Sequence, residues 1–315
     1  MGFPFAKLQG AGNDFVVVEG SGREWSALAP ALCDRRRGAG GDGVLVALPS
    51  ERADVRMQMF NPDGTEDECG NGLRCLALYA VRRGLVSGPE FRVETLSGVK
   101  AVRVHSPTPA DGGGGRGPAA GRERAVETAA TKAGSLPAET AGFRAGAGSG
   151  DEVQVTADMG RARLEPASVP VLWTGETALD LALPVDGETL RASALSTGTA
   201  HTVIWGIPDE ARFQRLSPLI EHHPLFPERT SVMWAEAEGP DRARVRIWER
   251  GAGETLACGT GACAVAVAGL LSGRTGREVR VECRGGVLRV EVSEGLELRL
   301  TGPAAWVYEG EWRGS

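Results

Sequence analysis

Two short cysteine–glycine loops carry the residues of this chain best suited to chemistry. The first is Cys69-Gly-Asn-Gly72 and the second is Cys258-Gly-Thr-Gly261. A run of apolar residues follows each loop, which predicts a buried helix that begins close to the glycines. A thiol at the N-terminus of a helix lies in the positive end of the helix dipole, which favours the thiolate. The uncovered N–H groups of the same turn would also hold a carboxylate.

The sequence on either side of the two loops repeats as well. Residues 56–60 precede the first loop as residues 244–248 precede the second, and residues 91–99 match residues 279–287 downstream. The offset stays near 188 residues, as between Arg56 and Arg244. A constant offset of this kind indicates an internal duplication. Two related halves would therefore each supply one thiol at a helix tip.

Several interpretations of the paired cysteines compete. They could be inert core residues, although glycine neighbours are poor core material. A structural zinc site would need further ligands at short spacing, which the sequence lacks. A disulfide between the halves would need facing thiols and an oxidising compartment. A nucleophilic Cys258 with His201 as its base would perform acyl transfer, but it leaves Cys69 without a role.

The remaining interpretation is acid–base chemistry on the α-carbon of an amino acid. Two thiols on opposite faces of one substrate can remove a proton from one side and return it on the other. Because this proton is a very weak acid, its removal needs a desolvated thiolate and fixed N–H dipoles around the developing charge. One cysteine must be a thiolate while the other stays protonated, since two adjacent thiolates repel each other.

Length, charge and cysteine usage limit the class of protein and its partners. A chain of 315 residues suggests about two domains. A net charge of −6, without a basic stripe, argues against a nucleic-acid partner. The N-terminus lacks a signal-peptide pattern, and the apolar run at 262–271 is too short to cross a membrane. Six cysteines without a Cys-x-x-Cys pair predict reduced thiols in the cytoplasm.

The elements that must position the two loops are mostly strands and turns. Residues 106–150 are rich in Gly, Ala, Pro, Thr and Ser, which predicts a flexible insertion or linker where the halves should join. Helices are expected at Trp25–Cys33 and at 213–222. A terminal strand at 306–308 is expected to cross back onto the first half. Further strands are expected within 5–19, 44–48, 153–159, 177–183, 191–205, 226–234, 287–292 and 296–300.

With these motifs in order, the sequence resembles the diaminopimelate epimerase family, cofactor-independent two-cysteine enzymes that interconvert LL- and meso-diaminopimelate for lysine and cell-wall synthesis. The resemblance implies an α+β fold of two pseudo-symmetric domains, each a curved sheet or barrel around a central helix. We expect them at 1–105 with the tail 303–315, and at 151–302, with the substrate in the cleft between them. The motifs that carry the resemblance are 10–15, 34–43, 60–64, 69–74, 226–229, 249–254 and 258–261.

The same resemblance implies roles for individual residues. Cys69 and Cys258 would be the two bases, and His201 and Glu249 would tune their thiols. The backbone at Gly70–Asn71 and Gly259–Thr260 would hold the reacting carboxylate of the substrate. The Arg250 guanidinium would bind the distal carboxylate, and Glu249 with the Arg250 backbone would bind amino groups. No cofactor and no metal is expected, and a homodimer is one option for assembly. The predicted substrate-binding residues are Asn13, Asn61, Gly70, Asn71, Glu249, Arg250, Gly259 and Thr260.

Two positions depart from the family pattern. Thr199 and Ser231 stand where the family usually has asparagines that contact the distal half of diaminopimelate. A hydroxyl reaches less far and lacks the paired amide donors, so the side-chain specificity stays open. A racemase of the same family that acts on another amino acid is one alternative. A non-catalytic amino-acid-binding protein that retains the cleft is another.

Overall fold

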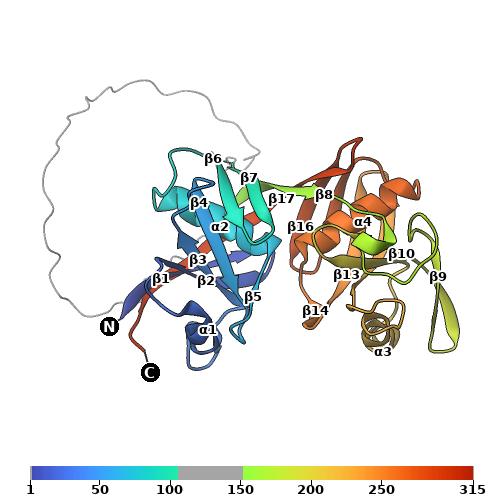
Figure 1. Ribbon diagram of the computed structural model, residues 1–315, viewed down its shortest axis with the longest axis horizontal. Coiled ribbons are helices and arrows are strands. Elements are labelled where there is room, and N and C mark those ends of the chain that lie inside the picture. Colours follow the sequence, from blue (N-terminus) through green and yellow to red (C-terminus); the bar gives the residue numbers. More distant parts are fainter. Residues whose placement is uncertain (1, 106–151, 315) are drawn as a thin grey trace, which may run out of the picture.

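The protein has an α+β fold of two lobes placed side by side (Figure 1). The computed structural model describes residues 2–105 and 152–314. The predicted insertion at 106–150 lies outside the described residues. In the described part of the chain, no helix is both long enough and apolar enough to cross a membrane.

The first lobe is a closed ring of eight strands around helix α2 (Gly70–Arg82). The ring closes because the last strand of the chain pairs with the first, from Phe3–Trp312 to Gln9–Ala305. Two neighbouring pairs are parallel, β2 with β3 and β4 with β6. In ring order the strands are β1 (Phe3–Gly10), β2 (Asn13–Glu19), β3 (Gly43–Leu48), β4 (Val55–Phe60), β6 (Glu90–Thr95), β7 (Gly98–Val104), β8 (Glu152–Arg161) and β17 (Glu297–Trp312).

The second lobe repeats this plan around helix α4 (Gly259–Leu271). Here β11 pairs in parallel with β12, and β13 with β15, in the same places along the ring as in the first lobe. A single bridge between Arg163 and Ser196 brings the chain after β8 back to β10. The strands are β10 (Glu188–Ser196), β11 (Ala200–Trp205), β12 (Ser231–Gly239), β13 (Arg242–Glu249), β15 (Glu278–Cys283) and β16 (Gly286–Val292), followed by β17 and β8. The predicted internal duplication is confirmed by this matched pairing.

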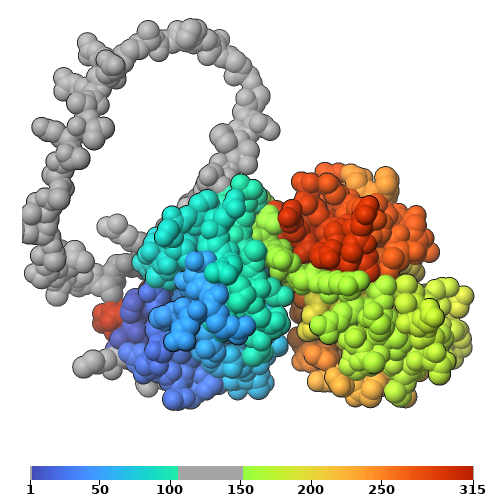
Figure 2. All heavy atoms as spheres, turned by 45° about the horizontal axis from the view of Figure 1, so that its top comes forward, coloured from blue at the N-terminus to red at the C-terminus, as the bar shows by residue number. Residues whose placement is uncertain are grey.

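Strands β8 and β17 belong to both lobes. They pair with each other from Glu152–Ala305 to Arg161–Glu297, and each runs from one ring into the other (Figure 1). In the space-filling view the lobes are two rounded bodies, and a green segment of β8 crosses the groove between them (Figure 2). The predicted domain boundaries lie at the end of β7, at the start of β8 and within β17, and we keep them as a proposal.

Hydrophobic cores lie inside and outside the two rings. The largest cluster contains the inner faces of the strands together with α2 and α4. Two smaller clusters lie under α1 (Trp25–Cys33) and α3 (Glu210–Glu221), which pack on the outside of the first and second ring. The remaining short elements are β5 (Glu66–Asp67), β9 (Leu181–Val185), β14 (Gly253–Thr255) and a 3-10 helix (Pro166–Ser168).

Small residues let each central helix begin close to the wall of its ring. A side-chain carbon at Gly72 would lie 2.9 Å from Leu45 Cδ2, and one at Gly261 would lie 2.5 Å from Met233 Sδ. Leu45 and Met233 occupy matching strands, β3 and β12. The third residue of each helix is therefore glycine because a larger side chain would meet the sheet.

Two predicted strands begin later than the sequence suggests. The strand expected from residue 226 begins at Ser231, after Arg229 adopts a φ of +63°. The strand expected from residue 177 begins at Leu181, after Asp180 adopts a φ of +53°. A left-handed residue of this kind interrupts extended backbone, so each strand starts only beyond it.

Candidate active site

The N-termini of α2 and α4 meet at the junction between the lobes. A side-chain carbon at Gly70 would lie 3.9 Å from the Cα of Gly259. The Asn71 side chain reaches across this junction, and its Nδ2 donates to the carbonyl oxygen of Ala257 at 3.1 Å. The two cysteine–glycine loops are therefore brought together from opposite lobes.

Cys69 and Cys258 line one cleft of about 140 Å³ at this junction. The cleft opens into a wider mouth of about 980 Å³, which also contains Asn13, Cys69, Glu249 and Arg250 in its lining. Of the predicted site residues, those in the wall of the inner cleft are Asn13, Cys69, Gly70, Asn71, Glu249, Arg250, Cys258, Gly259 and Thr260.

Each cysteine caps its helix through its own sulfur. Cys69 is the extended N-cap residue of α2, and its Sγ accepts from the backbone N–H of Gly72 at 3.4 Å. Cys258 is the matching N-cap of α4, and its Sγ accepts from Gly261 N–H at 3.4 Å. Each sulfur therefore lies at the N-terminus of its helix, beside the N–H donors of the first turn.

Burial dominates the acidity of both thiols. It raises the pKa of the Cys69 thiol to about 11, although N–H groups of the first turn of α2 oppose the shift. Burial likewise raises the pKa of Cys258 well above its usual value, and the Glu249 carboxylate raises it further. The predicted preference for thiolate at the helix N-terminus is thus outweighed by desolvation in this structure.

Glu249 and Asn61 occupy matching places at the ends of β13 and β4. Burial raises the pKa of the Glu249 carboxyl, while hydrogen bonds from Thr255 and Cys258 lower it. Asn61 lines the wider mouth, where its Nδ2 donates to Thr65 Oγ1 at 3.1 Å and to Asp67 Oδ2 at 3.3 Å. Glu249 therefore contacts a thiol, whereas Asn61 faces only the outer part of the cleft.

Arg250 is exposed at the rim and held by its backbone. Its N–H donates to Ser231 Oγ at 3.1 Å, and its guanidinium donates to the Glu228 carbonyl oxygen at 3.1 Å. The next residue, Gly251, donates its N–H to the buried Glu221 carboxylate at 2.9 Å. The turn that presents Arg250 is thus fixed while most of its guanidinium stays open to the cleft.

His201 lies behind the wall of the cleft. Its Nε2 is 3.0 Å from Thr199 Oγ1, which does line the cleft, and its Nδ1 has no hydrogen-bond partner among the described residues. Burial, with the nearby Arg250 charge, lowers the pKa of His201 to about 3, so the imidazole is neutral near pH 7. The contact that His201 makes in the structure is with the Thr199 hydroxyl, and its predicted action on the thiols stays a prediction.

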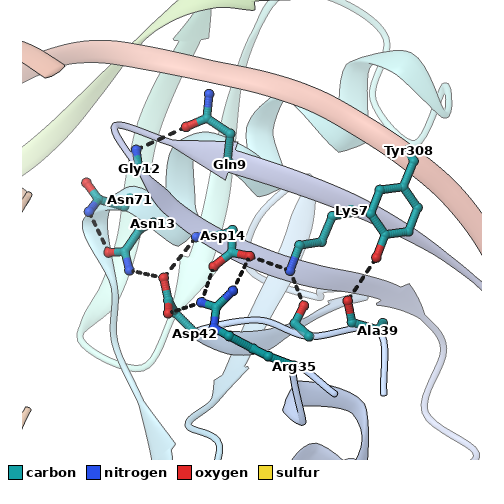
Figure 3. Close-up of polar contacts among 11 residues, drawn as sticks. Lys7, Gln9, Gly12, Asn13, Asp14, Arg35, Ala39, Asp42, Asn71 and Tyr308 are labelled. Atoms are coloured by element: carbon teal, nitrogen blue, oxygen red, sulfur yellow. Dashed lines mark hydrogen bonds and ion pairs between the residues drawn. The ribbon is translucent and has the colours of Figure 1, made fainter. Parts of the chain in front are cut away.

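The side chain of Asn71 is fully occupied. Its Nδ2 donates to Asn13 Oδ1 at 2.8 Å as well as to Ala257, and its Oδ1 accepts from the Arg74 guanidinium at 2.8 Å (Figure 3 shows the contact with Asn13). Only the backbone N–H of Asn71 can therefore serve the predicted grip on a carboxylate.

Sequence reasoning misses several residues that line the cleft. Thr197 supports the second helix tip, because its hydroxyl donates to the Thr260 carbonyl oxygen at 2.8 Å. The internal repeat is the signal that could have found most of them, since they lie in hairpin turns or beside the cysteine loops of the two rings, whereas Lys100 and Met159 lie within strands β7 and β8. The missed lining residues are Asp67, Glu68, Leu73, Ser97, Lys100, Met159, Thr197, Gly198 and Ala257. Within residues 2–105 and 152–314, no group of three His, Cys, Asp or Glu side chains is arranged to hold a metal ion.

Comparisons with known proteins agree with this geometry. A family model described as diaminopimelate epimerase matches residues 5–117 and 193–307. A diaminopimelate epimerase from Desulforudis audaxviator (strain MP104C) is 41% identical over 315 residues, covering 98% of each chain. One from Moorella thermoacetica is 40% identical over 316 residues, again covering 98% of each chain.

Solved structures share the fold at much lower identity. A hydroxyproline epimerase from Agrobacterium vitis superposes with a TM-score of 0.65 at 15% identity, covering 98% of this chain and 90% of that chain. A Bacillus anthracis phenazine biosynthesis protein of the PhzF family gives a TM-score of 0.60 at 16% identity, covering 99% of both chains. At these identities the likeness concerns the fold alone.

Proposed function

The chain belongs to the diaminopimelate epimerase family, and we propose from this premise that it interconverts LL- and meso-2,6-diaminopimelate with Cys69 and Cys258 as the two acid–base groups. The protein is an isomerase, and its reaction belongs to lysine biosynthesis. The single observation that carries the assignment of the two thiols is that they line one cleft from opposite lobes.

The two thiols have unequal surroundings, which suits a pair in which one sulfur is charged. Cys69 has first-turn N–H groups as its nearest donors, and these lower its pKa against the effect of burial. The Glu249 carboxylate raises the pKa of both thiols. At Cys258 it is the largest effect after burial and is joined by a hydrogen bond between the two side chains, whereas at Cys69 it is smaller than the effect of the Gly72 N–H. We therefore assign the thiolate of the resting enzyme to Cys69 and the protonated thiol to Cys258.

The reacting carboxylate fits between the two helix tips. Gly70–Asn71 and Gly259–Thr260 form the first turns of the two helices and line the cleft from both lobes, and the N–H groups of a first turn have no acceptor within their own helix. They stabilise the negative charge that moves onto the carboxylate when the α-proton leaves. A substrate carboxylate there also brings the α-carbon between the sulfurs, because both cysteines immediately precede these N–H groups.

The distal half of the substrate reaches toward the mouth of the cleft. There the Arg250 guanidinium binds the second carboxylate, and Glu249 binds an amino group. Thr199 and Ser231 line the same side, but Thr199 is engaged by His201 and Ser231 by the Arg250 N–H. This engagement favours, as a second candidate, a racemase of the same family that accepts a substrate with a different distal end.

A substrate panel in deuterated water separates these candidates. We expect LL-diaminopimelate to be epimerised and to gain solvent deuterium at the α-carbon, with far lower kcat/KM for ornithine, lysine and histidine. A higher kcat/KM for one of those three would establish the second candidate. Deuterium in none of the four would contradict catalysis and favour an amino-acid-binding protein.

The reaction also bears on location and assembly. Because both thiols must stay reduced to exchange protons, we propose the reducing cytoplasm as the site of action. A homodimer stays a prediction, and light scattering of the purified protein checks it.

A further inference from the structure

We propose that Asp42 and Arg74 are positioning residues that fix the direction of a hydrogen-bond relay through Asn71 and Asn13, so that Asn13 offers an N–H donor to an anionic substrate. This inference rests on the proposed function, because it concerns how the cleft receives a substrate carboxylate. The relay runs from the buried junction of the lobes to the rim of the cleft, and Figure 3 shows most of it.

Two amides form the centre of the relay. Asn71 Nδ2 donates to Asn13 Oδ1 at 2.8 Å, and Asn13 Nδ2 donates to Asp42 Oδ2 at 2.7 Å. An amide has nearly the same shape with its oxygen and nitrogen exchanged, so the two amides could not hold this direction by packing alone. Groups that can only donate or only accept must set it: the Ala257 carbonyl oxygen, which accepts from Asn71 Nδ2 at 3.1 Å, and the charged groups at the two ends of the relay.

Asp42 sets the outer end, because an ionised carboxylate can only accept hydrogen bonds. Its Oδ2 also accepts from the Asp14 N–H at 3.1 Å, and its Oδ1 accepts from Arg35 Nη2 at 2.6 Å. Arg35 and Lys7 in turn hold Asp14, at 2.6 Å and 2.7 Å (Figure 3). Although burial acts against it, the hydrogen bonds from Arg35 and Lys7 bring the pKa of Asp14 to about 2, so the Asp14 carboxylate stays charged at neutral pH.

Arg74 sets the inner end, because a guanidinium can only donate. Its side chain is fully buried, with Nη2 donating to Asn71 Oδ1 at 2.8 Å and Nε donating to the Pro303 carbonyl oxygen at 3.2 Å. If the oxygen and nitrogen of the Asn71 amide were exchanged, its N–H groups would face the N–H groups of Arg74, and two donors would lie opposite each other without an acceptor. The matching position in the second lobe is Cys263, so only the first lobe has this end group.

The fixed direction has a consequence at the cleft. Asn13 uses its oxygen for Asn71 and one N–H for Asp42, and the second N–H of its amide is left for a molecule in the cleft that Asn13 lines. A donor at that place attracts a carboxylate, whereas an oxygen would repel it. The relay therefore contributes to affinity for an anionic amino acid as well as to the fold.

An exchange of the amide and the carboxylate between positions 13 and 42 tests this directly. The variants are Asp42→Asn, Asn13→Asp and the double variant, with Asp34→Asn as control, since Asp34 lies in the same loop and accepts only from the N–H groups of Arg36 and Arg37. For each, kcat and KM with LL-diaminopimelate and the thermal midpoint are measured. In the double variant the amide introduced at position 42 can donate to the carboxylate introduced at position 13, so the bond between these two positions is kept while the Asp14 N–H loses its acceptor, and a carboxylate oxygen faces the cleft.

We expect Asp42→Asn to lower kcat/KM by about ten- to a hundredfold, the usual effect of losing a hydrogen bond to a charged group, with most of the loss in KM. The double variant should have a higher thermal midpoint than Asp42→Asn, because the bond between positions 13 and 42 is restored, without recovering KM, and Asp34→Asn should match the wild type. Recovery of both midpoint and KM in the double variant would show that the relay is only structural and overturn the proposal.

Variants at Arg74 keep the proposal testable if the exchange variants do not fold. Arg74→Lys retains a donor-only group and should keep KM within a few-fold of the wild type, while Arg74→Met should raise it. Equal KM for both variants would contradict the proposal that Arg74 fixes the direction of the hydrogen bonds through Asn71 and Asn13. Absence of epimerisation in the wild type would instead refute the proposed function, so the two failures are distinguishable.

Discussion

At the scale of single residues, each thiol of the site lies beside backbone N–H donors and is also shielded from water by burial. Each of the two thiols in the cleft accepts a hydrogen bond from the third N–H of its own helix, yet burial raises the pKa of both thiols. A buried thiol that becomes charged is a strong base, because little water stabilises the charge. The proposed chemistry needs this basicity, since the α-proton of an amino acid is weakly acidic.

Removing either sulfur tests its role. Cys69→Ala and Cys258→Ala should each lower kcat at least about a hundredfold in both directions, since positioned acid–base groups contribute about 10²–10⁴-fold and each direction needs both groups. Steady-state kinetics from LL- and from meso-diaminopimelate give the measurement. Cys263→Ala, in the same helix, is the matched control and should stay active. Wild-type turnover in either single variant would exclude the two-base assignment.

His201 predicts a pH dependence of stability. Its folded-state pKa of about 3 lies below the ordinary value of 6.5, so the unfolded chain binds one more proton between these values. The free energy of unfolding should therefore fall as the pH drops below about 6.5, by about 2 kcal/mol between pH 6.5 and 5 from this residue alone. His201→Asn should remove that part of the slope in urea denaturation.

The exposed His222 supplies the control for this experiment. His222→Asn makes the same change at a histidine exposed to solvent, and its free energy of unfolding is measured over the same pH range. If His201→Asn and the wild type lose stability in parallel between pH 6.5 and 5, the neutral buried imidazole is excluded.

At the scale of elements, hairpin turns from opposite lobes brace the cleft. Gly285, between β15 and β16, donates its N–H to the Leu256 carbonyl oxygen at 2.8 Å. A side-chain carbon at Gly285 would lie 2.0 Å from the carbonyl oxygen of Ala11, in the turn between β1 and β2. That turn leads directly to Asn13, so the position of a proposed substrate-binding residue depends on close packing between turns.

Gly285→Ala should therefore disturb the cleft. The added methyl meets backbone that cannot rotate away, and overpacking of this kind costs about 1–3 kcal/mol of stability. We expect a lower thermal midpoint together with a raised KM for LL-diaminopimelate. Gly88→Ala is the control, because no atom lies within 4 Å of the added carbon. Wild-type KM in Gly285→Ala would show that the two turns do not position Asn13.

Local features of the sequence predict the central elements well. The glycines after each cysteine and the apolar run that follows predict α2 and α4, and the repeat predicts that their tips are equivalent. The burial of His201 behind Thr199 and the full engagement of the Asn71 side chain could not be predicted, because both depend on contacts between distant segments. Strand β8 is a similar case, since its sharing by both lobes follows from pairing with β7 and β17 rather than from its own residues.

At the scale of the whole molecule, two antiparallel strands link the lobes while their helix tips form the site. Strands β8 and β17 each continue from one ring to the other, so the lobes share main-chain hydrogen bonds at the junction. Arg74 adds a buried contact there through the Pro303 carbonyl oxygen. The cleft is therefore built on a junction that both halves of the duplicated sequence must complete.

The chain on either side of the predicted insertion supports a deletion experiment. Val104 of β7 pairs with Val155 of β8, and the His105 N–H donates to the Gln154 carbonyl oxygen at 2.9 Å. A short connection can join such antiparallel neighbours, and shortening the loop reduces the entropic cost of bringing its two ends together. Replacing residues 111–148 by a short Gly-Ser linker should leave the thermal midpoint and kcat/KM close to wild type. Insoluble or inactive protein would show that the segment is needed for the core.

The most direct test of the two-thiol account follows the α-proton itself. Wild-type enzyme is given LL-diaminopimelate in deuterated water, and substrate and product are analysed by mass spectrometry and NMR at low conversion. Because different sulfurs remove and return the proton, the meso product should carry one solvent deuterium at the inverted α-carbon while the remaining substrate keeps its hydrogen. Transfer of the original hydrogen into the product, or deuterium in the unreacted substrate at the same rate, would mean a single base and contradict the account.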